Sequence, residues 1–117
     1  MSKIYRSRAP LRLGLAGGGT DVSPYSDIFG GAILNATISL FAYVDIEETN
    51  DGTIVFEAKD FECIEVYKIG YPIDHDGQLN LLKGVYNKLQ EDYPFETKGL
   101  KITTYVQAPP GSGLGSS

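Results

Sequence analysis

Strand-forming patterns fill the first half of the chain. Apolar and polar positions alternate loosely over residues 4–15, as in a strand with one buried face. Residues 32–48 are rich in β-branched and aromatic side chains and predict a second strand. Asn50-Asp51-Gly52 is a strong turn signal, and it predicts a hairpin into a third strand at residues 53–58. A fourth strand at residues 61–68 is expected to continue the same antiparallel meander.

The second half of the chain predicts a helix followed by a strand. The apolar positions of the helix recur at spacings of three and four: Leu79, Leu82, Tyr86, Leu89 and Tyr93. One face of a helix over about residues 80–92 is therefore expected to be apolar, and Pro94 ends it. Residues 100–106 alternate as a last strand. With a short helix expected within residues 21–29, where Ser23-Pro24 suits a first turn, the pattern predicts an α+β fold.

The charges are distributed unevenly along an acidic chain. The 10 Lys+Arg and 15 Asp+Glu give a formal net charge of -5, which argues against a nucleic-acid binder that depends on phosphate neutralisation. Nevertheless Lys3, Arg6, Arg8 and Arg12 all precede the first acidic residue, Asp21. The first strand either suits an anionic ligand or presents these cations to solvent.

Few other residues point to chemistry or to a cellular location. Cys63 is the sole cysteine, so neither an intrachain disulfide nor a cysteine metal cluster can form. His75 lies in a turn-like sequence and is assigned no function. The apolar stretch after Arg12 is too short for a secretory signal, and no run is long enough to span a membrane. We therefore expect a cytoplasmic protein.

A glycine-rich segment follows the last expected strand. Glycines alternate with other residues from Pro110 to Ser117, and the missing Cβ atoms let backbone amides form a concave nest for phosphate. Ser116-Ser117 suit the start of a helix, whose N-terminus would strengthen such a site. A flexible tail has a similar composition. The segment matches neither a Walker A loop nor the G-x-G-x-x-G fingerprint.

Two segments resemble conserved motifs of the GHMP kinases, the family of galactokinase, homoserine kinase and mevalonate kinase. PPGSGLGSS, from Pro109 to Ser117, resembles the second motif, and RAPLRLGLAGGGTD, from Arg8 to Asp21, resembles the N-terminal motif. The GGGTD form, followed by GGAILNATI at residues 30–38, is more similar to D-glycero-D-manno-heptose 7-phosphate kinases and fucokinase-like members than to galactokinase.

The resemblance carries an expectation for the fold. It spans nearly all of residues 1–117 and implies the N-terminal domain of the family, a mixed or antiparallel sheet covered by helices. Family members are much longer. The chain is accordingly expected to be an N-terminal fragment, inactive by itself, with downstream helices and a C-terminal domain outside it.

The resemblance also implies that ATP lies against the glycine-rich segment. Backbone amides there would hold the phosphates, and Ser117 would help to hold Mg²⁺. An ordinary helix cap is the alternative role for either serine. The residues expected to contact ATP are Pro110, Gly111, Ser112, Gly113, Leu114, Gly115, Ser116 and Ser117.

The first motif supplies the remaining expected roles. Arg12 matches an arginine near the transferring phosphoryl group, and its alternative is a surface cation. Asp21 matches an aspartate that accepts hydrogen bonds from sugar hydroxyls, and its alternative is an Asx-turn or a helix N-cap. Gly18 and Gly19 would bring backbone close to the sugar, with Thr20 as a hydroxyl contact, unless they simply form a tight turn. A catalytic aspartate is expected outside the chain.

The expected function is ATP-dependent phosphorylation of a sugar. The resemblance implies D-glycero-D-manno-heptose 7-phosphate as the substrate and its anomeric hydroxyl as the acceptor, in the synthesis of nucleotide-activated heptose. A fucokinase-like kinase of an unphosphorylated sugar and a non-catalytic sugar sensor of the same fold are the alternatives. The expected partners are a sugar or sugar phosphate and ATP, with neither nucleic acid nor membrane.

Overall fold

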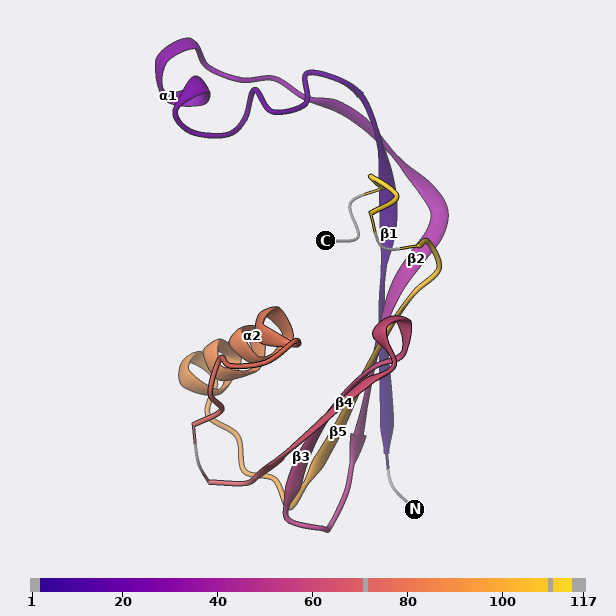
Figure 1. Cartoon of the computed structure of the whole chain (residues 1–117), viewed down its shortest axis with the longest axis vertical. Coiled ribbons are helices and arrows are strands. Elements are labelled where there is room, and N and C mark those ends of the chain that lie inside the picture. The colour runs from indigo at the N-terminus through magenta and orange to yellow at the C-terminus, as the bar shows by residue number, and fades with distance from the viewer. Residues whose placement is uncertain (1–2, 71, 110, 115–117) are drawn as a thin grey trace. The chain divides into compact units, whose positions relative to one another are not determined.

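Five strands and two α-helices form an α+β structure. The computed structural model describes residues 3–70, 72–109 and 111–114. Its elements are β1 (Ile4–Ala16), α1 (Tyr25–Phe29), β2 (Leu34–Glu48), β3 (Thr53–Ala58), a 3₁₀ turn (Lys59–Phe61), β4 (Cys63–Lys68), α2 (Asn80–Asp92) and β5 (Leu100–Val106) (Figure 1). Each expected strand is found within two residues of its expected bounds, and the helix over residues 80–92 is confirmed.

The order of the strands corrects the expected meander. The sheet runs β1-β2-β5-β3-β4, so β5 lies between β2 and β3, and the hairpin predicted at residues 50–52 does not pair its two strands. β3 pairs with β4 in antiparallel register and with β5 in parallel register, which makes the sheet mixed. The turn bonds instead to the segment before β5: the Thr49 amide donates to Gly99 O at 2.9 Å and the Gly52 amide to Lys98 O at 2.9 Å.

The hydrophobic core lies between α2 and one face of β3 and β5, and Figure 1 shows α2 on one side of these strands. The Phe56 ring on β3 makes edge contacts with the Tyr67 ring at 6.1 Å between centroids and with the Tyr86 ring of α2 at 5.7 Å. The buried apolar residues of this core are Ile54, Phe56, Ala58, Ile73, Leu79, Leu100 and Ile102. The buried side chains that alternate along β3 and those that recur at helical spacing on α2 therefore pack in one core.

Only the first half of the predicted apolar face of α2 is covered. Leu79 is buried, and Leu82 and Tyr86 pack against the core, as expected. Leu89 and Tyr93, further along the same face, are 49% and 72% exposed. The chain folds back after the helix, and Phe95 covers the Tyr86 ring at 6.1 Å between centroids.

The chain divides into two compact units. The first unit comprises residues 1–7 and 43–105 and contains the core between α2 and the sheet. The second unit comprises residues 8–42 and 106–117, and its buried apolar residues among those the structure describes are Leu11 and Ala108. Every site residue expected from the sequence belongs to the second unit. None of the helices in the described ranges has the length and apolar character needed to cross a bilayer.

Candidate active site

The glycine-rich segment is held against β1. The backbone amide of Arg12 donates a hydrogen bond to Leu114 O at 2.9 Å, and the Ser112 amide donates to Pro109 O at 3.2 Å. Gly111 and Gly113 have φ values of 77° and 76°, a left-handed conformation that favours glycine. When residues in the left-handed conformation alternate with residues in other conformations, successive backbone amides point to one side, as in an anion-binding nest. The two motifs that the sequence singled out are therefore in contact through their backbones.

Part of the expected phosphate site lies outside the described residues. Pro110, Gly115, Ser116 and Ser117 are in this group, so their predicted contacts with ATP and Mg²⁺ stay predictions. A Cβ added to Gly111 or Gly113 would meet no described atom within 4 Å. The described part of the loop thus leaves open space at both glycines, which fits the phosphate that the sequence predicts there.

The Arg12 side chain is exposed, and the backbone of Arg12 is bonded to this loop. Within the described ranges no carboxylate pairs with its guanidinium and no acceptor receives a hydrogen bond from it. Two other cations of β1 are engaged. Arg6 makes a bidentate ion pair with Asp45, with both nitrogen-to-oxygen distances at 2.7 Å, and the Arg8 guanidinium lies 4.6 Å from the centre of the Phe41 ring. Arg12 is accordingly the cation of this strand with a guanidinium available to an anion.

The Thr20 side chain joins the loop after β1 to the segment before β2. The Thr20 hydroxyl donates to Gly17 O at 2.7 Å and accepts from the Ala32 amide at 3.2 Å. A Cβ on Gly17 would lie 1.9 Å from Ala32 O, and one on Gly31 would lie 2.1 Å from Thr20 O. The hydroxyl of Thr20 therefore joins the two segments, while its contact with a sugar stays a prediction.

Gly18 differs from its neighbours. A Cβ added to Gly18 would meet no described atom within 4 Å, and the φ of Gly18 lies outside the left-handed region. Gly19 has equal space but a φ of 85°, so glycine is favoured there by conformation. Among the described residues neither a clash nor a left-handed φ requires glycine at position 18, and the expected close approach of the sugar there stays a prediction.

We expect Gly31→Ala to destabilise the complete protein by about 1–3 kcal/mol, because the Thr20 carbonyl must move to admit the methyl group. Gly18→Ala should leave the melting temperature unchanged within about 1 °C, yet raise KM for the sugar. Thermal unfolding of both variants, with sugar kinetics for Gly18→Ala, checks this pair. Equal loss of stability in the two variants would contradict this account of the loop.

Asp21 stands at the end of this loop with an exposed carboxylate. The N-cap of α1 is Pro24, and no side chain caps that helix, so the expected alternative role of Asp21 as a helix cap is wrong. Ser23 Oγ instead donates to the Asp27 carboxylate. Across the described residues the Asp21 carboxylate accepts no hydrogen bond and meets no cation, so it does not hold an Asx-turn either. Its acceptor oxygens are free for a ligand.

The entry to the glycine-rich segment is fixed by Gln107. Its side-chain oxygen accepts a hydrogen bond from the backbone amide of Phe41 at 2.8 Å, and the backbone amide of Gln107 donates to Phe41 O at 3.0 Å. The next residue, Ala108, is buried. These bonds join β2 to the chain that leaves β5, so the glycine-rich segment starts from an anchored position. The sequence pattern gave no indication of this role for Gln107.

A buried charge cluster in the first unit was also missed by the sequence analysis. Lys83 Nζ is fully buried and donates to Tyr67 Oη at 3.0 Å, to Glu65 Oε2 at 2.9 Å and to Asp76 O. The Tyr67 hydrogen bond and the Glu65 carboxylate raise the pKa of Lys83, and the Lys83 ammonium lowers the pKa of Glu65. Lys83 lies four residues after Leu79 and three before Tyr86, so helical spacing could have placed it on the apolar face.

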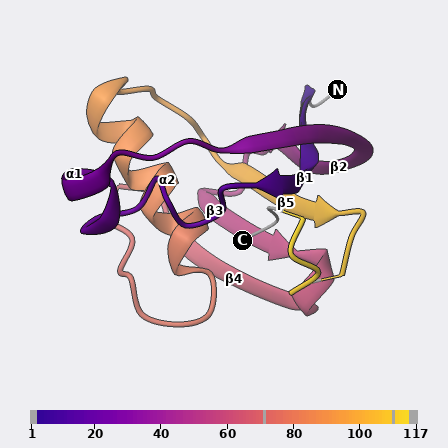
Figure 2. The same ribbon diagram turned by 90° about the horizontal axis from the view of Figure 1, so that it is seen from above.

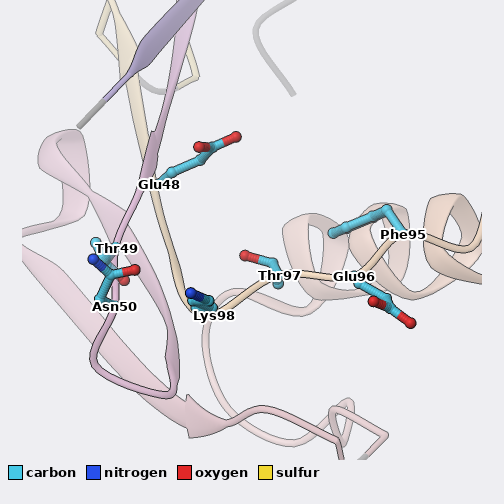
Figure 3. A pocket seen from close by; sticks show the side chains of 7 residues that line it. All are labelled: Glu48, Thr49, Asn50, Phe95, Glu96, Thr97 and Lys98. Carbon is cyan, nitrogen blue, oxygen red and sulfur yellow. The ribbon is translucent and has the colours of Figure 1, made fainter. Parts of the chain in front are cut away.

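A cavity of about 720 Å³ in the first unit contains none of the expected site residues (Figure 3). It lies between the turn after β2 and the segment that precedes β5, and the side chains of Glu48 and Phe95 extend toward one another across it. Its lining residues are Glu48, Thr49, Asn50, Phe95, Glu96, Thr97 and Lys98. With two carboxylates against one ammonium, this lining does not suit a triphosphate.

Comparisons with known proteins agree with the two motifs. Residues 80–117 match the GHMP kinases N terminal domain. The chain is 40% identical over 115 residues to the D-glycero-alpha-D-manno-heptose 7-phosphate kinase of Campylobacter jejuni, a match covering 98% of this chain and 34% of that protein. It is 30% identical over 137 residues to the L-fucokinase/L-fucose-1-P guanylyltransferase of Bacteroides fragilis, covering 98% of this chain and 14% of that protein.

A solved structure agrees with the fold. The crystal structure of a D-glycero-D-manno-heptose 1-phosphate kinase from Bacteroides thetaiotaomicron matches with a TM-score of 0.85 and 59% identity, over 96% of this chain and 36% of that one. The chain thus spans about a third of the length of the heptose phosphate kinases that it matches. The mixed sheet agrees with the expected N-terminal fold of the GHMP kinases, to which the chain is similar in sequence and in structure.

Proposed function

We propose that the complete protein transfers the γ-phosphoryl group of ATP to the anomeric hydroxyl of D-glycero-D-manno-heptose 7-phosphate. The observation that carries this proposal is the hydrogen bond from the Arg12 amide to Leu114 O, because it joins the glycine-rich loop to the backbone of a residue whose guanidinium has no partner among the described residues. Identities of 40% and 59% to heptose phosphate kinases support the substrate class. The product would feed the synthesis of nucleotide-activated heptose, in the cytoplasm.

The proposed binding of ATP uses the backbone of the glycine-rich segment. Amides around Gly111 and Gly113 would donate to the phosphate oxygens. The φ values of 77° and 76° favour glycine at these two positions, which therefore carry no side chain. The ATP would carry Mg²⁺, which neutralises phosphate charge, and Ser117 is the residue that we propose to help hold the ion. The remaining residues of the segment, Pro110, Gly115 and Ser116, would complete the loop around the phosphates.

The transfer itself needs orientation and charge neutralisation. The anomeric oxygen attacks the γ-phosphorus, the bond from that phosphorus to the bridging oxygen breaks, and ADP leaves. Arg12 would stabilise the charge on the phosphoryl oxygens as this exchange proceeds. Asp21 would accept hydrogen bonds from sugar hydroxyls, and Gly18 and Gly19 would let the sugar approach the backbone. The proton of the hydroxyl passes to a base that we place outside this chain.

A coupled assay of ADP release from the complete protein tests the proposal. The acceptors are D-glycero-D-manno-heptose 7-phosphate, the corresponding 1-phosphate, fucose, galactose and mevalonate, each with Mg-ATP. We expect the highest kcat/KM with the 7-phosphate. A higher value with fucose would favour the fucokinase-like function, and a higher value with the 1-phosphate would move the acceptor to position 7. Sugar binding without ADP release would indicate a sensor.

A further inference from the structure

The outer edge of β4 is available for pairing. β4 is the last strand of the sheet, and across the described residues no strand pairs with its second edge (Figure 2). The Ile69 amide donates to Gly52 O at 3.1 Å, which continues the antiparallel register of β3 and β4 by one residue. Because hydrogen-bonded pairs alternate in such a ladder, the backbone groups of Ile64, Val66 and Lys68 face away from β3. These groups form a short template for another strand.

The side chains along this edge divide between the two faces of the sheet. Cys63 and Tyr67 pack against the core, and Glu65 bonds to Lys83 on the same side. Ile64 and Val66 are on the opposite face, 61% and 59% exposed. On the core side, residues 74–78 lie against this edge, and the Gln78 amide donates to Glu65 Oε1 at 3.3 Å. On the other face, Ile64 and Val66 form an exposed apolar pair beside backbone groups that no described strand pairs, a feature that natural sheets usually avoid unless the edge is used.

The residues on this edge are complementary to themselves under two-fold symmetry. An antiparallel pairing of two copies about an axis at Glu65 places Ile64 opposite Val66 of the partner subunit, twice. The same register brings Lys68, at each end, next to the start of the partner strand, which Glu62 of the partner subunit precedes in a left-handed conformation with a φ of 49°. Across the described residues neither Glu62 nor Lys68 has an ion-pair partner. A two-fold interface repeats each favourable contact, so apolar pairs at the centre are flanked by opposite charges at both ends.

The residue on the axis does not oppose this pairing. Glu65 would face its own counterpart, and two bare carboxylates there would repel. Each carboxylate is already paired within its own subunit, however, with Glu65 Oε2 2.9 Å from Lys83 Nζ and 3.0 Å from Tyr67 Oη. We propose that β4 pairs with β4 of a second copy of this protein, in antiparallel register about Glu65, and joins the two sheets into one.

Sedimentation equilibrium of the complete protein tests this interface. We expect a dimer at micromolar concentration, and we expect Val66→Lys to raise its dissociation constant at least about tenfold, because it puts charge at the centre of the paired edges. Leu81→Lys is the matched control, since Leu81 is a 74% exposed apolar residue on α2. A monomeric wild type, a dimer unaffected by Val66→Lys, or a dimer broken only by Leu81→Lys would overturn the proposal.

A charge exchange tests the register without touching the apolar centre. Glu62→Lys and Lys68→Glu should each weaken the dimer, since each puts like charges opposite one another at both ends. The double variant restores opposite charges and should recover the dissociation constant of the wild type to within about threefold. Two additive losses in the double variant would overturn the register about Glu65, even if the protein remains dimeric.

Discussion

Replacing Arg12 by methionine is expected to lower kcat of the complete protein in the proposed reaction roughly 10²–10³-fold, with a much smaller change in KM for either substrate. The reason is that the backbone of Arg12 is bonded to the glycine-rich loop, and its exposed guanidinium has no partner among the described residues. A charge that acts mainly on the transferring phosphoryl group affects the transition state more than either ground state. Steady-state kinetics with heptose phosphate and ATP varied in turn measures both constants.

Arg8→Met is the matched control for Arg12→Met. Arg8 is on the same strand and carries the same charge, but its guanidinium lies over the Phe41 ring at 4.6 Å. We expect kcat of this variant to stay within about threefold of the wild type, since loss of one exposed cation–π contact costs at most about 1 kcal/mol of stability. Equal losses of kcat in the two variants would show that the strand contributes a general positive field rather than one positioned cation.

Gly113→Val is expected to raise KM for ATP by at least about tenfold while KM for the sugar changes little. Two effects act together: valine is strained at the φ of 76° found here, and its side chain would occupy the loop where we propose that the phosphates bind. Gly113→Asn separates them, because asparagine tolerates a left-handed conformation far better but still brings a side chain. We expect Gly113→Asn to keep the melting temperature of the wild type and still to weaken ATP binding.

Asp21→Asn provides the opposite pattern. This change keeps the shape of an exposed side chain that accepts no hydrogen bond from the described residues. It removes one acceptor and the negative charge, so we expect KM for the sugar to rise and KM for ATP to stay within about twofold of the wild type. If Asp21→Asn and Gly113→Val altered the same substrate, the division between a sugar loop and a phosphate loop would be wrong.

The sequence predicted the elements of this structure better than their pairing. Local patterns determine whether residues 53–58 or 80–92 form a strand or a helix, and both were found at the expected bounds. Pairing depends on residues far apart in the chain. Asn50-Asp51-Gly52 does reverse the chain direction, but β5, which begins at Leu100, inserts between β2 and β3. No signal within the turn could indicate that its amides would bond to Lys98 and Gly99.

The site was predicted through motifs, and its supporting contacts were not. Arg12, Asp21, Gly111 and Gly113 were singled out by residue type and order. Their arrangement depends on contacts that no single-sequence pattern encodes, such as the bond from the Arg12 amide to Leu114 O. Gln107 and Lys83 gave no signal by residue type, since an uncharged amide and a lysine on a helix are usually exposed. The structural role of each of these two residues comes from the residues that surround it in the folded chain.

The most direct test of the proposed reaction is the position of the new phosphate in the product. We would incubate the complete protein with Mg-ATP and D-glycero-D-manno-heptose 7-phosphate and record phosphorus NMR spectra with proton coupling. The account predicts a bisphosphate whose new phosphorus signal is coupled to the anomeric proton, formed together with ADP. A new phosphate at any other position, or release of inorganic phosphate with the sugar unchanged, would contradict it.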